Sequence, residues 1–268
     1  MKTILPISLL VLGITLTSCK NTDKENRQPE TDNSIQETAV KDTIRLEKLT
    51  GSVSYPEASL TLQKPTGSSV NSKTIDFDFE VENYELGEQT DSPLASTLAN
   101  SGKGQHIHLI VNNNPYSAHY EPEFSKELSE GTHHIVAFLS RSYHESVKNE
   151  NSFVYKTIQI GSEKEDETRV DMEKPTLIYS RPKGEYSRSD TENLLLDFFL
   201  LNTELSKNGN KVKATINGIE FLIDEWAPYV IKGLPKGEVS IRLELIDKEG
   251  NKIKGAYNDV TRIVTLKE

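Results

Sequence analysis

From Ile44 onward the chain alternates short apolar and polar runs, and none of these runs keeps the 3.6-residue period of an amphipathic helix. Turn-forming residues separate the runs, a pattern typical of antiparallel strands that bury one face. In the first half we predict strands over residues 45–54, 58–63, 74–86, 105–112, 124–128, 132–140 and 152–160. Short strands in this number predict an immunoglobulin-like β-sandwich.

The second half of the chain repeats the pattern of the first. Residues 62–67 (LQKPTG) correspond to residues 179–184 (YSRPKG), and residues 106–112 (HIHLIVN) correspond to residues 211–217 (KVKATIN). Each unit has about 95–115 residues, the size of one sandwich domain. The sequence therefore predicts an all-β fold of two tandem immunoglobulin-like sandwiches.

The predicted boundaries follow from composition. We place the first sandwich at residues 44–161 and the second at residues 174–268, joined by an acidic linker over residues 162–173. Residues 19–43 are polar and charged, and they contain too few large apolar side chains to bury a core. We therefore expect these residues to form a flexible tether.

Residues 1–18 predict a lipoprotein signal peptide. Lys2 precedes an apolar stretch over residues 4–16 that is too short to span a bilayer as a mature helix. Leu16-Thr17-Ser18-Cys19 then resembles a bacterial lipobox, in which the chain is cleaved before the cysteine and the thiol is acylated. Cys19 is the only cysteine, so we expect its lipidation and no disulfide.

These features place the protein in a bacterial cell envelope, with the membrane as a partner through the N-terminal lipid and the outer membrane as the expected location. The net charge of −10 and the absence of a Lys/Arg cluster exclude nucleic acid, which needs a basic footprint.

All six histidines lie between positions 106 and 144, so only the first of the two copies carries them. A residue type absent from one copy is not needed for the shared fold, which directs the search for function to this segment. Alternation along the strand places His106 and His108 on its outer face, where the second copy has Lys211 and Lys213. Two strand positions apart, the histidines are separated by roughly 6.5–7 Å.

Immunoglobulin strand order identifies the third histidine of this group. It pairs the strand at 105–112 with the strand at 132–140, so that His106 lies opposite Ser140 and His108 opposite Phe138. His134 then falls on the order of 13 Å from His108, too far to share an ion. His144 follows the second strand and returns to the end where His106 lies.

We predict a metal site from His106, His108, His144 and Glu145, because imidazole and carboxylate ligands suit zinc or copper. The same end of the domain offers an alternative, a small anionic ligand or a sugar. Arg141 and Lys148 would contact an anion, and Phe138 and Tyr143 would stack on a ring.

His133 aligns with Val239, an inward position of the second copy. We therefore expect His133 to be a structural residue, hydrogen-bonded to backbone. The remaining alternative is that the histidines are solvated, and that the chain is a structural or adhesive protein that binds protein or carbohydrate without metal.

Catalytic motifs do not favour an enzyme. The chain has no Gly-X-Ser-X-Gly elbow, no phosphate-binding glycine-rich loop and no His-Glu-X-X-His helix. We expect a binding module.

The motifs Gly104-X-His106-X-His108, Gly131-Thr132-His133 and Arg141-X-X-X-Glu145-Ser146-X-Lys148 resemble those of a group of uncharacterised bacterial envelope lipoproteins, most like those of Bacteroidota. The resemblance covers the first domain well and the second weakly. Some members carry the automatic label phosphopeptide-binding protein, which would assign Arg141 and Lys148 to anion contacts. Asn112 and Asn113 stand where similar sequences often place an acidic residue.

Overall fold

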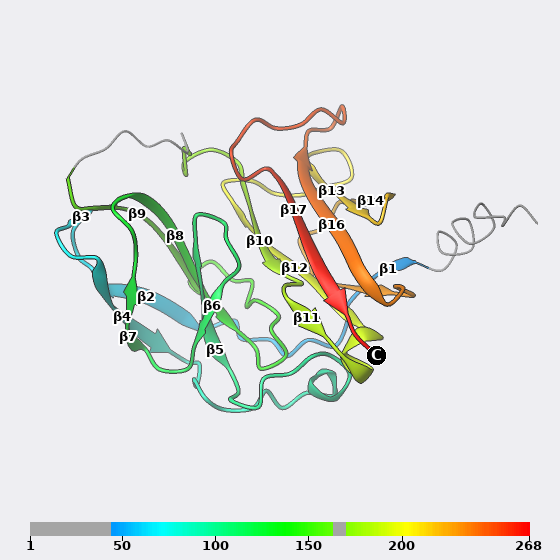
Figure 1. Cartoon of the computed structure of the whole chain (residues 1–268), viewed down its shortest axis with the longest axis horizontal. Helices are drawn as coiled ribbons and strands as arrows, with labels where there is room; N and C mark the ends of the chain where they lie inside the picture. The colour runs from blue at the N-terminus through cyan, green and yellow to red at the C-terminus, as the bar shows by residue number, and fades with distance from the viewer. Residues whose placement is uncertain (1–43, 163–169) are drawn as a thin grey trace, which may run out of the picture.

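A computed structural model describes residues 44–162 and 170–268, and their regular structure consists of β-strands with two short 3-10 helices (Figure 1). The predicted signal peptide, Cys19, the tether and most of the acidic linker lie outside these residues. None of the described residues belongs to a helix long and apolar enough to cross a membrane.

The first sandwich packs a three-stranded sheet against a five-stranded sheet. The smaller sheet has the order β2 (Ser59–Lys64), β4 (Thr74–Glu82) and β7 (Glu123–Glu127). The larger sheet has the order β3 (Ser69–Val70), β9 (Phe153–Ile160), β8 (Gly131–Ser140), β5 (His106–Val111) and β6 (Ser117–His119). A 3-10 helix, η1 (Pro93–Ser96), lies in the loop before β5.

The second sandwich repeats this topology. One sheet contains β10 (Thr176–Arg181), β12 (Leu194–Leu201) and β15 (Tyr229–Lys232). The other has the order β11 (Glu185–Tyr186), β17 (Asp259–Leu266), β16 (Gly237–Ile246), β13 (Lys211–Ile216) and β14 (Ile219–Ile223), and η2 (Arg188–Thr191) precedes β12. Even the register shift between β2 and β4 recurs between β10 and β12. The predicted fold of two tandem immunoglobulin-like sandwiches is confirmed.

The first predicted strand, over residues 45–54, differs from expectation in length and in place. β1 covers only Arg45–Lys48, and it pairs antiparallel with β15 of the second sandwich, with Arg45 opposite Lys232. Ile44 beside it is buried in the second core. The reason is physical: β15 would otherwise be an edge strand with unpaired backbone groups, and β1 covers this edge.

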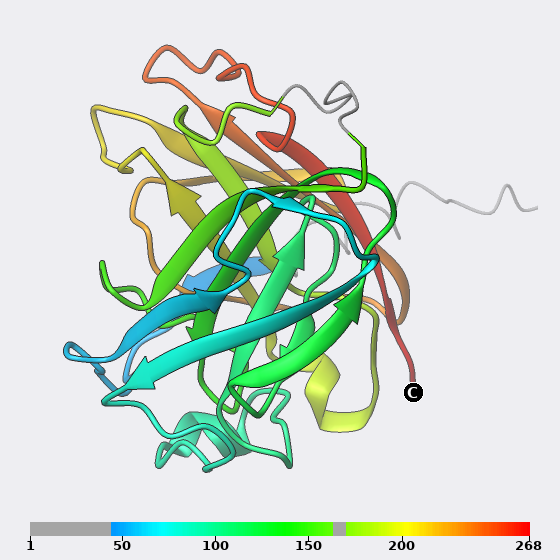
Figure 2. The same ribbon diagram turned by 90° about the vertical axis from the view of Figure 1, so that its left-hand side faces the viewer.

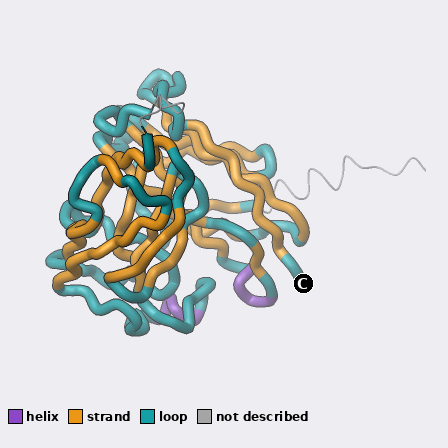
Figure 3. Tube along the Cα trace, turned by 60° about the vertical axis from the view of Figure 1, so that its left-hand side comes forward, coloured by secondary structure: helices purple, strands orange, loops and turns teal. Residues whose placement is uncertain are grey.

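The two sandwiches pack face to face. The larger sheet of the first sandwich covers the outer face of the β10–β12–β15 sheet. Figures 2 and 3 show the strands of one sandwich lying against those of the other. We call the buried layer between them the seam. Its apolar residues are Ile110, Tyr116, Val136, Phe138, Met172, Ile178, Phe199, Leu201 and Tyr257.

Strand β12 has both faces covered because of this packing. Its residues alternate between the second core, where Phe198 lies, and the seam, where Phe199 lies, and all eight are buried. The Phe199 ring stacks on Phe138 of the first sandwich with 4.9 Å between ring centres. The outer face of β5, which carries two of the candidate histidines, is thus an interior surface.

Candidate metal centre

The predicted register between the two central strands of the first sandwich is confirmed. β5 and β8 are antiparallel neighbours, with His106 opposite Ser140 and His108 opposite Phe138. At the far end, the backbone N–H of Asn112 donates to the carbonyl oxygen of His134. His134 is therefore separated from the other two histidines along the strands.

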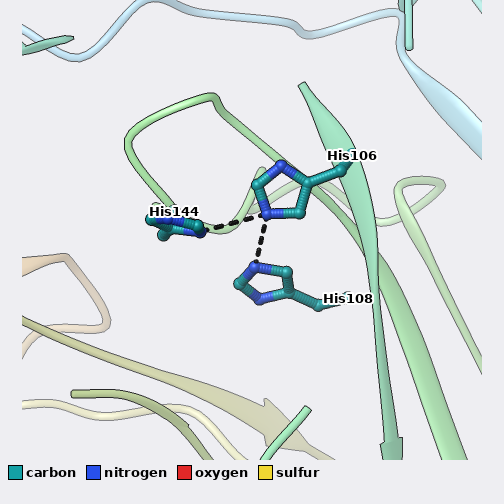
Figure 4. Close-up of side chains that lie close together, drawn as sticks. All are labelled: His106, His108 and His144. Carbon is teal, nitrogen blue, oxygen red and sulfur yellow. Dashed lines mark hydrogen bonds between the residues drawn. The ribbon is translucent and has the colours of Figure 1, made fainter. Parts of the chain in front are cut away.

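Three histidine side chains converge at the start of β5 (Figure 4). His106 Nε2 lies 2.9 Å from His108 Nε2 and 3.1 Å from His144 Nδ1. One ligand atom from each ring can be chosen so that all three lie within 4.8 Å of one another. We call His106, His108 and His144 the histidine trio.

His144 reaches the trio through an unusual backbone conformation. It occupies the turn between β8 and β9 with a φ of 69°, in the left-handed region. The equivalent turn of the second sandwich has Gly250 at this place, with a φ of 87° and the same backbone hydrogen bond back across the turn. A side chain in this conformation costs about 1–2 kcal/mol relative to glycine. The histidine at this position is therefore not explained by the needs of the turn.

The seam shields His106 and His108 from water. His106 and His108 are 0% exposed, which contradicts the alternative that they are solvated. The second sandwich covers the outer face of β5, and its Ser180 Oγ lies 3.3 Å from His108 Nδ1. The interpretation of His106 and His108 as solvated surface residues is thus wrong. Their strand face would be exposed in an isolated first sandwich, but the second sandwich covers it.

Hydrogen bonding fixes which nitrogen of His106 faces the trio. His106 Nδ1 lies 2.8 Å from the carbonyl oxygen of Gly104, which can only accept, so Nδ1 carries the proton. Nε2 of His106 then has one in-plane lone pair and two nitrogen neighbours at hydrogen-bond distance. One lone pair cannot satisfy both neighbours. A cation between the three nitrogens would use a lone pair from each.

The spacing of the trio suits a small transition-metal ion. With Zn–N bonds of 2.0–2.1 Å, tetrahedral geometry places ligand nitrogens about 3.3 Å apart. The separations of 2.9 and 3.1 Å lie just below this value. The three ligand atoms all lie within 4.8 Å of one another, so the side chains would have to adjust until the separations are equal for one ion to contact all three nitrogens.

The environment keeps the trio neutral. Burial lowers the pKa of His106 to about 4, although its hydrogen bond to Gly104 opposes the shift. Burial also holds the pKa of His108 well below its usual value, and burial together with the cation of Arg181 lowers the pKa of His144. Neutral imidazole is the form that coordinates a metal, so the ligands need not release protons at neutral pH.

We expect the metal-free protein to lose stability as the pH falls from about 7 to about 4. The unfolded chain binds protons at its histidines near pH 6.5, whereas native His106 does so only near pH 4. The unfolded state binds more protons in this window, so the free energy of unfolding decreases as the pH is lowered. Calorimetric unfolding across the window measures the slope, which should be shallower in a His106→Gln variant. An equally steep slope in that variant would contradict the assignment.

The structure does not bring Glu145 to the trio. Its carboxylate lies 3.2 Å from Arg141 Nη1 and accepts a hydrogen bond from Ser52 Oγ at 2.7 Å. Arg141 in turn donates to the carbonyl oxygens of Val53 and Ser146. Both side chains are buried and hydrogen-bonded within the protein. The predicted metal ligand Glu145 is therefore not free to bind a metal, and the predicted anion contact Arg141 is not free to bind an anion.

The other three predicted ligand contacts are also interior residues. Lys148 pairs with Asp197 of the second sandwich. Phe138 is 0% exposed and stacks on Phe199, and Tyr143 is 0% exposed in a small apolar cluster with Leu98. The second sandwich and the loop before β5 cover the two rings that we predicted to stack on a ligand, and Lys148, the predicted anion contact, already has a carboxylate partner.

The remaining histidines lie apart from the trio. His133 Nε2 is 2.8 Å from the carbonyl oxygen of Ser129, and its Nδ1 is 3.1 Å from the side-chain amide nitrogen of Asn112. His119 stacks on Phe124 with 3.4 Å between ring centres. Each has partners of its own within the first sandwich.

Two neighbours of the trio were not identified from the sequence. The Tyr116 ring stacks on His108 with 3.5 Å between ring centres, and its hydroxyl lies 3.2 Å from His144 Nδ1. Ser180 contacts His108 from the other sandwich. Tyr116 lies in the loop after β5 and could have been proposed from that position. No sequence signal points to Ser180.

No protein-family model matches the chain. No curated protein matches it either. Among solved structures, the fibronectin(III)-like modules of Clostridium thermocellum CbhA are 12% identical, over 78% of this chain and 94% of that one, with a TM-score of 0.27. The central fibronectin-III array of RIM-binding protein is 14% identical, over 81% and 71%, with a TM-score of 0.26.

A Bacteroides ovatus protein of a mixed-linkage glucan utilization locus, SGBP-B in complex with a mixed-linkage heptasaccharide, is 8% identical. The similarity covers 78% of this chain and 47% of that one, with a TM-score of 0.24. Likeness at this level concerns the class of fold alone.

Proposed function

We propose that this chain is a membrane-tethered envelope protein that binds one transition-metal ion, zinc or copper, between its two sandwiches. The ligands are His106 Nε2, His108 Nε2 and His144 Nδ1. The observation that carries the proposal is the convergence of three neutral imidazoles on one point, two of them fully buried and the third, His144, partly buried. The lipobox ending in Cys19 supports the membrane tether.

The groups around the trio suit metal ligation. Gly104 accepts from the far nitrogen of His106, and Ser180 lies beside the far nitrogen of His108. Such partners orient ligating imidazoles and fix their tautomers. Borderline ligands of this type favour zinc or copper over magnesium or calcium, which prefer oxygen.

A binding role is favoured over catalysis. His106 and His108 are fully buried, and only His144 of the trio is partly exposed. An ion can enter past the turn that carries His144, whereas an organic substrate could enter only if the two sandwiches separated. Three protein ligands leave a fourth position for water or another small ligand.

His144→Gly is expected to abolish tight metal binding while the fold is retained. It removes one ligand at a position where the second sandwich already has glycine, so the turn itself should not suffer. The full-length protein, extracted from membranes with detergent and stripped of metal, is titrated calorimetrically with Zn²⁺ and Cu²⁺. We expect one ion per chain for the wild type and at least about 100-fold weaker binding for the variant.

His119→Gln is the matched control, because His119 is a partly buried histidine outside the trio. It should bind metal as the wild type does. A wild-type protein that takes up neither ion, or equal affinity in His144→Gly, would overturn the metal proposal.

A further inference from the structure

Beside the trio, the seam contains three cations for which the described residues supply no carboxylate. Arg181 and Arg262 are buried, and Lys183 is partly buried. Their hydrogen-bond partners are neutral. Arg181 Nη1 donates to the Tyr186 hydroxyl at 2.6 Å, and Lys183 Nζ donates to the Tyr116 carbonyl oxygen at 2.6 Å. Within residues 44–162 and 170–268, none of the three cations forms an ion pair. In a chain of net charge −10 this local excess of positive charge is exceptional.

The same place has more hydrogen-bond donors than acceptors. Arg181 Nε is buried and has no partner among the described residues. The Tyr186 hydroxyl already accepts from Arg181 Nη1 and from the backbone N–H of Lys183. Its own proton is therefore free to be donated, and Lys183 uses only one of its three ammonium protons on Tyr116. A buried donor without a partner destabilises a fold, so an acceptor at Arg181 Nε would be favourable.

The ring of Tyr116 separates the ammonium group of Lys183 from the trio. The His108 ring centre lies 3.5 Å from the Tyr116 ring centre, and Lys183 Nζ lies 3.6 Å from it. At such distances the two must occupy opposite faces of Tyr116. The tyrosine ring therefore stands between the metal ligands and the ammonium group.

We propose that a small oxyanion binds here, held by the Arg181 guanidinium, the Lys183 ammonium and the Tyr186 hydroxyl. An oxyanion supplies several acceptor oxygens and the missing negative charge at once, and guanidinium groups bind it through charge-assisted hydrogen bonds. Lys183 lies on the connection between β10 and β11 and is partly exposed, so the anion can enter from this side.

The excess charge also affects Lys183. Burial, together with the positive charges of Arg181 and Arg262, lowers the pKa of Lys183 to about 8. A bound anion would oppose both effects. The site goes beyond the proposed metal binding, because none of its donors is a histidine.

The test uses the full-length protein and three probes, namely inorganic phosphate, sulfate and acetate, with chloride as the ionic-strength control. We expect a saturable rise in the unfolding temperature with at least one oxyanion, and loss of this rise in Lys183→Met. Lys254→Met, which changes an exposed lysine of the second sandwich, should keep the wild-type response. A rise with phosphate or sulfate but not with acetate would show that the site binds a tetrahedral anion. A rise with acetate would show that it binds a carboxylate.

Two results would overturn the anion site. One is the absence of a saturable shift with every probe, and the other is an unchanged shift in Lys183→Met. Repeating the titration with His144→Gly separates this site from the metal. We expect the anion response to persist there, and its loss would mean that the anion is only a ligand of the metal.

Discussion

Replacing Lys148 with methionine is expected to lower the free energy of unfolding by about 3–5 kcal/mol. Lys148 reaches from the first sandwich to Asp197 of β12, whose side chain is 0% exposed. Asp197 would keep its contacts with the backbone N–H and hydroxyl of Ser146, both at 3.2 Å, but it would lose its counter-charge. An uncompensated carboxylate in the seam is costly because little water can reach it. Chemical denaturation of wild type and variant measures the loss.

The double variant Lys148→Met/Asp197→Asn is the control for charge. It removes both partners, while the asparagine can still contact Ser146. We expect it to recover most of the stability, because the cost of the single change comes from the orphaned charge rather than from the lost pair. A single variant that loses less than about 1 kcal/mol would show that Asp197 is solvated in the native protein.

Phe199→Ala is expected to destabilise the protein by about 3–5 kcal/mol and to weaken the coupling between the sandwiches. Phe199 packs against Phe138 and Phe153 of the first sandwich and Trp226 of the second, with ring centres 4.8–4.9 Å apart. Its removal leaves a cavity at the centre of the seam. Scanning calorimetry should show the wild type unfolding in one transition and the variant in two.

Leu222→Ala provides the comparison for this experiment. Leu222 lies on β14 and is 64% exposed, so its truncation should leave both stability and cooperativity nearly unchanged. If Phe199→Ala also unfolds in a single transition at the wild-type temperature, the seam does not couple the two sandwiches.

The trio could be predicted because its position depends on rules that are local to one sandwich. Period-two alternation places His106 and His108 on one face of β5, and the immunoglobulin strand order brings the turn after β8 to the same end. The expected pairing of His106 with Ser140 is the observed one. Neither step requires knowledge of the second sandwich.

The environment of the trio could not be predicted in the same way, because it depends on how the domains pack. Lys148 and Phe138 would be available to a ligand only in an isolated first sandwich. One signal was present in the sequence: the run LLLDFFLL at residues 194–201 is apolar at nearly every position. In an antiparallel sheet such a run indicates that both faces are covered. Glu145, in contrast, lies in the turn after β8 and beside His144 with its left-handed backbone, where the alternation rules of a strand do not apply.

The pairing of β1 with β15 determines where mechanical load enters the protein. The chain passes through the sheet of the second sandwich before it builds the first, with Ile44 buried in the second core. Tension applied through the preceding residues, as a membrane anchor would apply it, reaches the β1–β15 ladder first. Until this short ladder peels away, the β-strands that hold the trio carry little of the force.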